Sequence, residues 1–168
     1  MEKLFLIDAY ALIFRSYYAF LKHPSLNSKG MNTSAIMGFC NTLQEIMQKE
    51  KPTYLGVAFD HGKTFRHEAF PAYKAQRDET PEDIKQSVPW IKDILKALRI
   101  PVYQADGFEA DDVIGTLATK AGLAGVKTFM LTPDKDYGQL VSDNVMMYKP
   151  RHGGGYDVID KTALTSQY

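Results

Sequence analysis

The sequence has few of the residues from which several kinds of site are built. It contains one cysteine, Cys40, which excludes an internal disulfide and fits a reducing compartment. Its four histidines show no metal-ligand spacing with one another or with Cys40, which argues against a zinc site. The first apolar run, residues 4–7, is too short for a signal peptide or a membrane span. We therefore expect a cytoplasmic protein that does not enter a membrane.

Familiar phosphate and nucleophile motifs are also missing. The glycines at 153–155 are not followed by the Lys-Ser/Thr pair of a phosphate-binding loop and do not form a dinucleotide fingerprint. There is no serine-nucleophile motif and no internal repeat. The formal net charge of zero decides nothing about nucleic acid, because the local distribution of charge matters more than its sum. A length of 168 residues predicts one domain with an ordinary core.

The hydrophobic pattern alternates between short β-rich runs and amphipathic stretches. Helices are indicated from residue 33 or 34 to 47, from Thr80-Pro81 onward with a kink or break at Pro89, and over 109–124. Segments 22–33 and 149–155 are predicted to be loops. The alternation predicts an α/β fold with a parallel sheet covered on both faces. The β-rich runs are 3–7, 54–59, 101–104, 127–131 and 144–148.

Acidic residues gather where predicted strands end. Ligands of such sheets bind outside the carboxyl ends of the strands, and carboxylates that follow different strands share that edge. Clustered carboxylates repel one another and need a cation to stay ionised, and oxygen ligands suit Mg²⁺ or Mn²⁺. The pattern predicts a metal-dependent phosphodiester site. Its candidate metal ligands are Asp8, Asp60, Glu109, Asp111, Asp112, Asp134 and Asp136.

Each of these acids also has an ordinary explanation. Asp8 or Asp60 alone would more often cap a helix, and the acids at 109–112 favour the start of a helix dipole. Asp134 and Asp136 belong to a Thr-Pro-Asp-Lys-Asp segment, whose residue types favour a turn. Three acids within four residues exceed what a helix start needs, however, so the set as a whole favours a metal site.

Residues 63–77 form a second candidate functional segment, which is rich in basic and aromatic residues. This basic–aromatic segment has four Lys/Arg, one acid and three aromatic residues, and it follows closely on Asp60. Basic side chains neutralise phosphates and aromatic rings stack on unpaired bases, although a solvated helix face would show the same composition. Next to an acidic cluster, the segment is interpreted as a clamp for a polyanion, and Arg15 as a further phosphate contact.

Together these motifs resemble the 5′-nuclease family, specifically the N-terminal 5′→3′ exonuclease domain of bacterial DNA polymerase I. The resemblance implies a PIN-like α/β core with a roughly five-stranded parallel sheet and helices on both faces. It also implies a structure-selective nuclease that uses two divalent metal ions, Mg²⁺ or Mn²⁺, on DNA flaps and 5′ ends in replication and repair. The matching motifs are Leu6-Ile7-Asp8, Phe14-Arg15, Val57-Ala58-Phe59-Asp60, Phe65-Arg66-His67-Glu68, Tyr73-Lys74-Ala75-Gln76-Arg77, Gly107-Phe108-Glu109-Ala110-Asp111-Asp112 and Thr132-Pro133-Asp134-Lys135-Asp136-Tyr137-Gly138-Gln139-Leu140.

The resemblance also implies roles for single residues. The seven acids match metal-site carboxylates of the family. Lys74 and Arg77 match arch residues that act on the scissile phosphate. DNA-binding roles are implied for four residues: Phe14, Arg15, Arg66 and Tyr73.

The expected extent and partners follow from the same resemblance. We expect residues 1–168 to be the N-terminal PIN-like portion of such a domain, truncated before its helix–turn–helix element, in a monomer whose parent chain carries a C-terminal polymerase domain. Three alternatives remain open. The first is a DNA-binding module that no longer cuts. The second is a PIN-type ribonuclease, which lacks the family arch, whereas the arch motif Tyr73–Arg77 is present in this sequence. The third is a phosphatase or receiver domain, which explains only Asp8 and Asp60.

Overall fold

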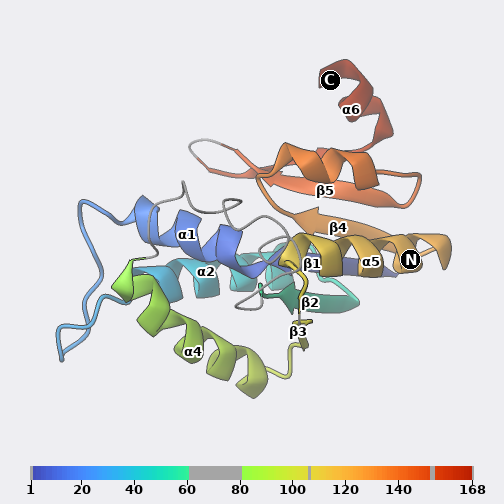
Figure 1. Ribbon diagram of the computed structural model, residues 1–168. Helices are drawn as coiled ribbons and strands as arrows, with labels where there is room; N and C mark the ends of the chain where they lie inside the picture. The colour runs from blue at the N-terminus through green and yellow to red at the C-terminus, as the bar shows by residue number, and fades with distance from the viewer. Residues whose placement is uncertain (1, 61–80, 106, 152–153, 168) are drawn as a thin grey trace.

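The computed structural model describes residues 2–60, 81–105, 107–151 and 154–167. Its described strands form one sheet in the order β3-β2-β1-β4-β5-β6, in which the first five are parallel and β6 runs antiparallel to β5 (Figure 1). The strands are β1 Lys3–Asp8, β2 Tyr54–Ala58, β3 Val102–Tyr103, β4 Lys127–Leu131, β5 Val145–Pro150 and β6 Tyr156–Ile159.

Helices lie on both faces of this sheet. Alternate residues of β1 face opposite sides, so that Phe5 and Ile7 are buried beneath α1, α2 and α4, while Leu6 is buried beneath α5 and η2. The predicted α/β class, parallel sheet and two-sided cover are confirmed. The helices are α1 Ala9–Ala19, α2 Ser34–Lys49, α4 Glu82–Ala97, α5 Ala110–Leu123, the 3₁₀ helix η2 Lys135–Leu140 and α6 Lys161–Gln167.

Four details differ from the sequence-based expectation. The antiparallel strand β6 was not predicted, and β5 extends to Pro150, into the segment 149–155 that was expected to be a loop. The predicted strand at 101–104 is reduced to Val102–Tyr103 at the sheet edge. Pro89 does not break α4, which continues through it as one helix. A proline removes one N–H from a helix, and here the buried residues Ile84, Ile91 and Leu95 hold both halves against the core.

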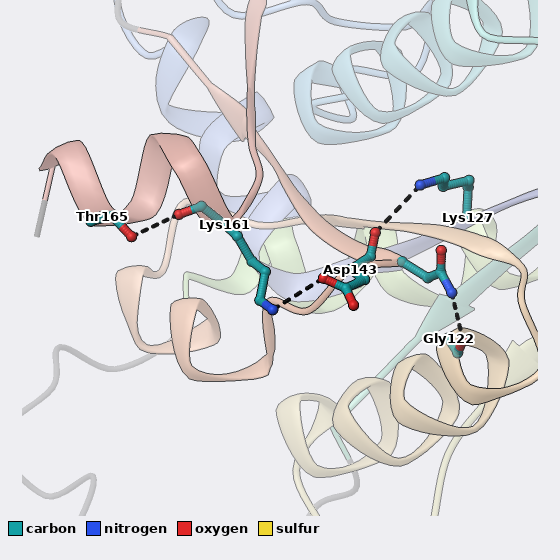
Figure 2. Close-up of polar contacts among 6 residues, drawn as sticks. Gly122, Lys127, Asp143, Lys161 and Thr165 are labelled. Carbon is teal, nitrogen blue, oxygen red and sulfur yellow. Dashed lines mark hydrogen bonds and ion pairs between the residues drawn. The ribbon is translucent and has the colours of Figure 1, made fainter.

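A polar network ties α6 to the end of the sheet where β4 and β5 begin (Figure 2). The Lys161 ammonium forms an ion pair with Asp143 Oδ1 at 3.0 Å, and Lys127 Nζ donates to the Asp143 carbonyl at 3.3 Å. Next to them, Asn144 donates to the Gly122 carbonyl at the end of α5. Because these residues lie at the amino ends of parallel strands, Asp143 is an acid remote from the carboxyl edge described below.

In the part of the chain that the structure describes, no helix combines the length and the apolar character that crossing a membrane requires.

Candidate metal centre

The carboxyl ends of β1 and β2 place Asp8 and Asp60 at one edge of the sheet. Asp8 is the last residue of β1 and pairs in register with Ala58, two residues before Asp60. Asp8 is also the N-cap of α1, and its Oδ1 accepts a hydrogen bond from the Ala11 N–H at 3.4 Å. The helix-capping explanation of Asp8 is therefore realised, but it leaves the second carboxylate oxygen for other partners.

Asp60 joins the start of α5 to this edge. The Ala110 N–H, in the first turn of α5, donates to Asp60 Oδ1. A carboxylate at a helix N-terminus is favourable because free N–H groups and the helix dipole face it. This contact brings the acids of the 109–112 segment next to the strand ends.

The acids at the start of α5 form a compact group. Glu109, Asp111 and Asp112 each offer a carboxylate oxygen within 4.8 Å of the others. Glu109 and Asp112 form a reciprocal capping box, in which the Glu109 N–H donates to Asp112 Oδ2 at 3.0 Å and the Glu109 side chain accepts from the Asp112 N–H. Capping therefore accounts for part of what Glu109 and Asp112 do, whereas Asp111 is not a member of the capping box.

The electrostatics of Asp8 show that these acids act on one another. Burial, followed by the charge of Asp60 and to a smaller extent that of Asp111, raises the pKa of Asp8 to about 7. Hydrogen bonds from the Ala11 N–H and from the hydroxyl of Tyr137 oppose this rise without cancelling it. At neutral pH the cluster is therefore costly to ionise fully, and a cation among its oxygens would relieve the repulsion. A donor set made of carboxylate oxygens fits a hard divalent cation.

The two acids at the start of η2, Asp134 and Asp136, have different surroundings. Asp136 is exposed and lines a cavity of about 510 Å³ together with Asp111, Asp112 and Tyr137, so the structure brings it to the acids of α5. Asp134 is also exposed, and its carboxylate accepts from the Asp136 N–H at 2.9 Å, which caps the first turn of η2. For Asp134, the turn explanation is the one that the described contacts support.

The predicted DNA-binding residues are described only in part. Phe14 and Arg15 lie on α1, the helix that begins directly after Asp8. Phe14 stacks on Tyr18 with ring centroids 6.3 Å apart, and the exposed Arg15 donates to the Arg151 carbonyl at 3.3 Å. Four predicted residues lie outside the described residues: Arg66, Tyr73, Lys74 and Arg77.

One residue of the site was quoted in a sequence motif but given no role. Tyr137 is 2% exposed, and its hydroxyl donates to Asp8 Oδ2 at 3.3 Å. Burial and the charge of Asp8 raise its pKa well above the ordinary value, so the hydroxyl keeps its proton. The two residues are 129 positions apart. The one local signal for this contact was a tyrosine directly after Asp136.

Solved structures share this fold. The T5 D15 protein co-crystallised with metal ions aligns with a TM-score of 0.66 at 22% identity, covering 88% of this chain and 55% of that one. The catalytic core of Rad2 in complex with DNA aligns with a TM-score of 0.61 at 19% identity, covering 99% of this chain and 48% of that one. The α/β fold of this chain is thus also found in these two proteins.

Sequence comparison establishes the family. The model of the 5′-3′ exonuclease N-terminal resolvase-like domain matches residues 3–168, and the chain belongs to this family. DNA polymerase I of Chloroflexus aurantiacus is 43% identical over 162 residues, which are 96% of this chain and 17% of that protein. A 5′-3′ exonuclease of Aquifex aeolicus is 42% identical over 151 residues, 89% of this chain and 52% of that protein. The chain therefore spans a small part of one relative and about half of the other. The predicted resemblance is confirmed.

Proposed function

We propose that this chain is a divalent-metal-dependent, structure-selective 5′→3′ exonuclease and flap endonuclease that hydrolyses DNA phosphodiesters in replication and repair. The observation that carries the proposal is the convergence of Asp8, Asp60 and Asp111 at one sheet edge, where burial, followed by the charges of Asp60 and Asp111, raises the pKa of Asp8 to about 7. The relatives named DNA polymerase I and 5′-3′ exonuclease support it. Another structure of the T5 D15 protein, a pseudo-enzyme-product complex with DNA and metal ions, shows that a protein of this fold binds both, which supports the proposal.

The metal would be Mg²⁺ or Mn²⁺, because all the candidate ligands are carboxylate oxygens. In a two-metal site such cations supply an activated water and neutralise charge on the attacking and leaving oxygens. The residues proposed to hold them are the seven predicted acids: Asp8, Asp60, Glu109, Asp111, Asp112, Asp134 and Asp136.

The basic and aromatic side chains that are not proposed as metal ligands would bind and orient the DNA. Arg15, on the helix that leaves the site, supplies a positive charge for a phosphate, and Phe14 beside it supplies a ring for stacking. Arg66 and Tyr73 are proposed to do the same from the basic–aromatic segment. Lys74 and Arg77 are proposed to stabilise the charge that develops on the scissile phosphate. We further propose a cytoplasmic monomer that acts on 5′ flaps and 5′ ends, with a polymerase domain on the same parent chain.

Cleavage of a 5′-labelled flap DNA in Mg²⁺ tests this function. The 168-residue chain is expected to shorten the labelled strand, and EDTA is expected to stop the reaction. Asp111→Asn removes one charged ligand with little change of shape, and we expect at least a hundredfold slower cleavage. Asp143→Asn is the matched control, because Asp143 is an acid at the opposite end of the sheet that pairs with Lys161. It should cleave at the rate of the unsubstituted chain.

Two results would contradict the proposal. One is cleavage by Asp111→Asn at the unsubstituted rate. The other is binding of the flap DNA by the unsubstituted chain without any cleavage in Mg²⁺ or Mn²⁺, which would indicate the DNA-binding module that does not cut.

A further inference from the structure

Tyr137 links two parts of the candidate metal centre that are distant in sequence. It lies in η2, directly after Asp136, and its ring is buried in the core cluster that also contains Leu6, Ala58 and Ala110. Those three residues belong to β1, β2 and the first turn of α5, the same elements that bring Asp8, Asp60 and Asp111 to the edge. The ring thus packs against the elements that carry these acids, and its hydroxyl reaches Asp8 Oδ2 at 3.3 Å.

The Asp8 carboxylate is consequently held at both oxygens. Oδ1 accepts from the Ala11 N–H of α1 at 3.4 Å, and Oδ2 accepts from Tyr137 of η2. Each carboxylate oxygen has two lone pairs, so one donor per oxygen fixes the plane of the group and still leaves a lone pair for a cation. Of these two donors, the hydroxyl of Tyr137 is the one that belongs to a side chain and can be removed by substitution.

We propose that Tyr137 is a positioning residue of this site: it orients Asp8 toward the divalent cation and ties η2, with Asp136, to the carboxyl edge of the sheet. The inference rests on the proposed function, because it takes Asp8 to be a metal ligand. Hydrogen-bond donors that hold a ligand in place commonly contribute about 10- to 100-fold to metal affinity. A tyrosine whose role was only to fill the core would not affect affinity in this way.

Tyr148 supplies a matched control of the same chemistry. It is 8% exposed, and its hydroxyl donates to a carboxylate oxygen, Glu50 Oε2, at 3.4 Å. It lies in the other core cluster, with Phe5 and Ile7, on the opposite face of the sheet from Tyr137. Tyr→Phe at either position removes one hydroxyl and retains the ring.

Mn²⁺ binding to the 168-residue chain, followed by the electron paramagnetic resonance signal of free Mn²⁺, tests the proposal without any need for catalysis. We expect Tyr137→Phe to raise the Kd for Mn²⁺ about tenfold and Tyr148→Phe to leave it within about twofold of the unsubstituted value. Circular dichroism without metal shows whether each variant is folded. A folded Tyr137→Phe variant with an unchanged Kd would overturn the proposal and leave the proposed function standing. If the unsubstituted chain binds no Mn²⁺, both fail.

A second readout needs no substitution and serves if Tyr137→Phe does not fold. Carbon-13 spectra of the tyrosine rings of the unsubstituted chain are recorded during a Mg²⁺ titration. The signal of the hydroxyl-bearing ring carbon of Tyr137 should shift as Mg²⁺ binds, because its hydrogen-bond acceptor becomes a metal ligand. That of Tyr148 should not. A Tyr137 signal that remains still at saturating Mg²⁺ would overturn the proposal.

Discussion

Asp8 caps a helix and also carries a buried negative charge that lowers the stability of the folded chain. As the N-cap of α1, it satisfies a free N–H of the first helical turn. The same carboxylate is buried beside Asp60 and Asp111, and its pKa rises from 3.8 to about 7. Between these pH values the folded protein holds a proton that the unfolded chain has released. The free energy of unfolding therefore falls as pH rises from about 4 to about 7, and it stays lower above that range.

Asp8→Asn tests this linkage in the metal-free protein. Asparagine is an equally good N-cap and carries no charge, so the variant should be more stable than the unsubstituted chain at pH 8. The upper limit of the gain is on the order of 4 kcal/mol, and the gain should vanish near pH 4, where Asp8 is protonated in the folded state. Urea unfolding at the two pH values measures it. A variant that is less stable at pH 8 than at pH 4, relative to the unsubstituted chain, would refute the assignment.

A bound metal ion should turn the ionised Asp8 from a destabilising group into a stabilising one. A divalent cation must displace the proton from Asp8, so Mg²⁺ is expected to raise the melting temperature of the unsubstituted chain more at pH 8 than at pH 6. Asp8→Asn should lose most of the increase at both pH values. An equal increase at pH 6 and pH 8 would show that Asp8 does not ligate the metal.

At the scale of elements, the position of α1 depends on how closely it packs against α2. α1 begins directly after Asp8 and carries Phe14 and Arg15, so a shift of this helix moves three proposed site residues. Gly38 of α2 faces Ser16 of α1, and a Cβ at Gly38 would lie 2.4 Å from Ser16 Cβ and 3.1 Å from its Cα. The second atom belongs to the backbone, so the clash cannot be relieved by a side-chain rotation alone.

Gly38→Ala should therefore destabilise the protein although alanine favours helices. We expect a loss of about 1–3 kcal/mol in the free energy of unfolding. Gly115→Ala in α5 is the matched control, because the nearest atom to its added Cβ is Leu140 Cδ1 at 3.4 Å. It should be neutral or stabilising by up to about 1 kcal/mol. Urea unfolding distinguishes the two, and equal stability of Gly38→Ala and the unsubstituted chain would show that α1 and α2 are free to separate.

At the scale of the whole molecule, the sheet and its cover followed from hydrophobic patterning. Five of the six described strands overlap runs that were predicted from sequence, because buried parallel strands are short, apolar and separated by helices. The strand β6 was missed because Tyr156–Ile159 contributes only one fully buried residue, Ile159, to the core. Its pairing with β5 is therefore a tertiary effect with little local signal.

The candidate site was predictable to a similar extent. Topology alone required Asp8 and Asp60 to share an edge, and helix spacing required Glu109 and Asp112 to share a face. The contact between Tyr137 and Asp8 could not be predicted, because it depends on the packing of Tyr137 against the face of the sheet opposite α1. The metal-ligand roles of all seven acids remain predictions, and the described hydrogen bond of Asp134 is a local cap.

The proposed function requires the carboxyl edge of this sheet to bind divalent cations. Anomalous diffraction from crystals of the chain soaked in Mn²⁺ tests it most directly, because the signal locates the ion without reference to activity. We expect an anomalous peak within about 2.5 Å of carboxylate oxygens of Asp8, Asp60 or Asp111. A map in which these side chains are well ordered, Mn²⁺ is bound elsewhere on the protein, and no peak lies at this edge would contradict it.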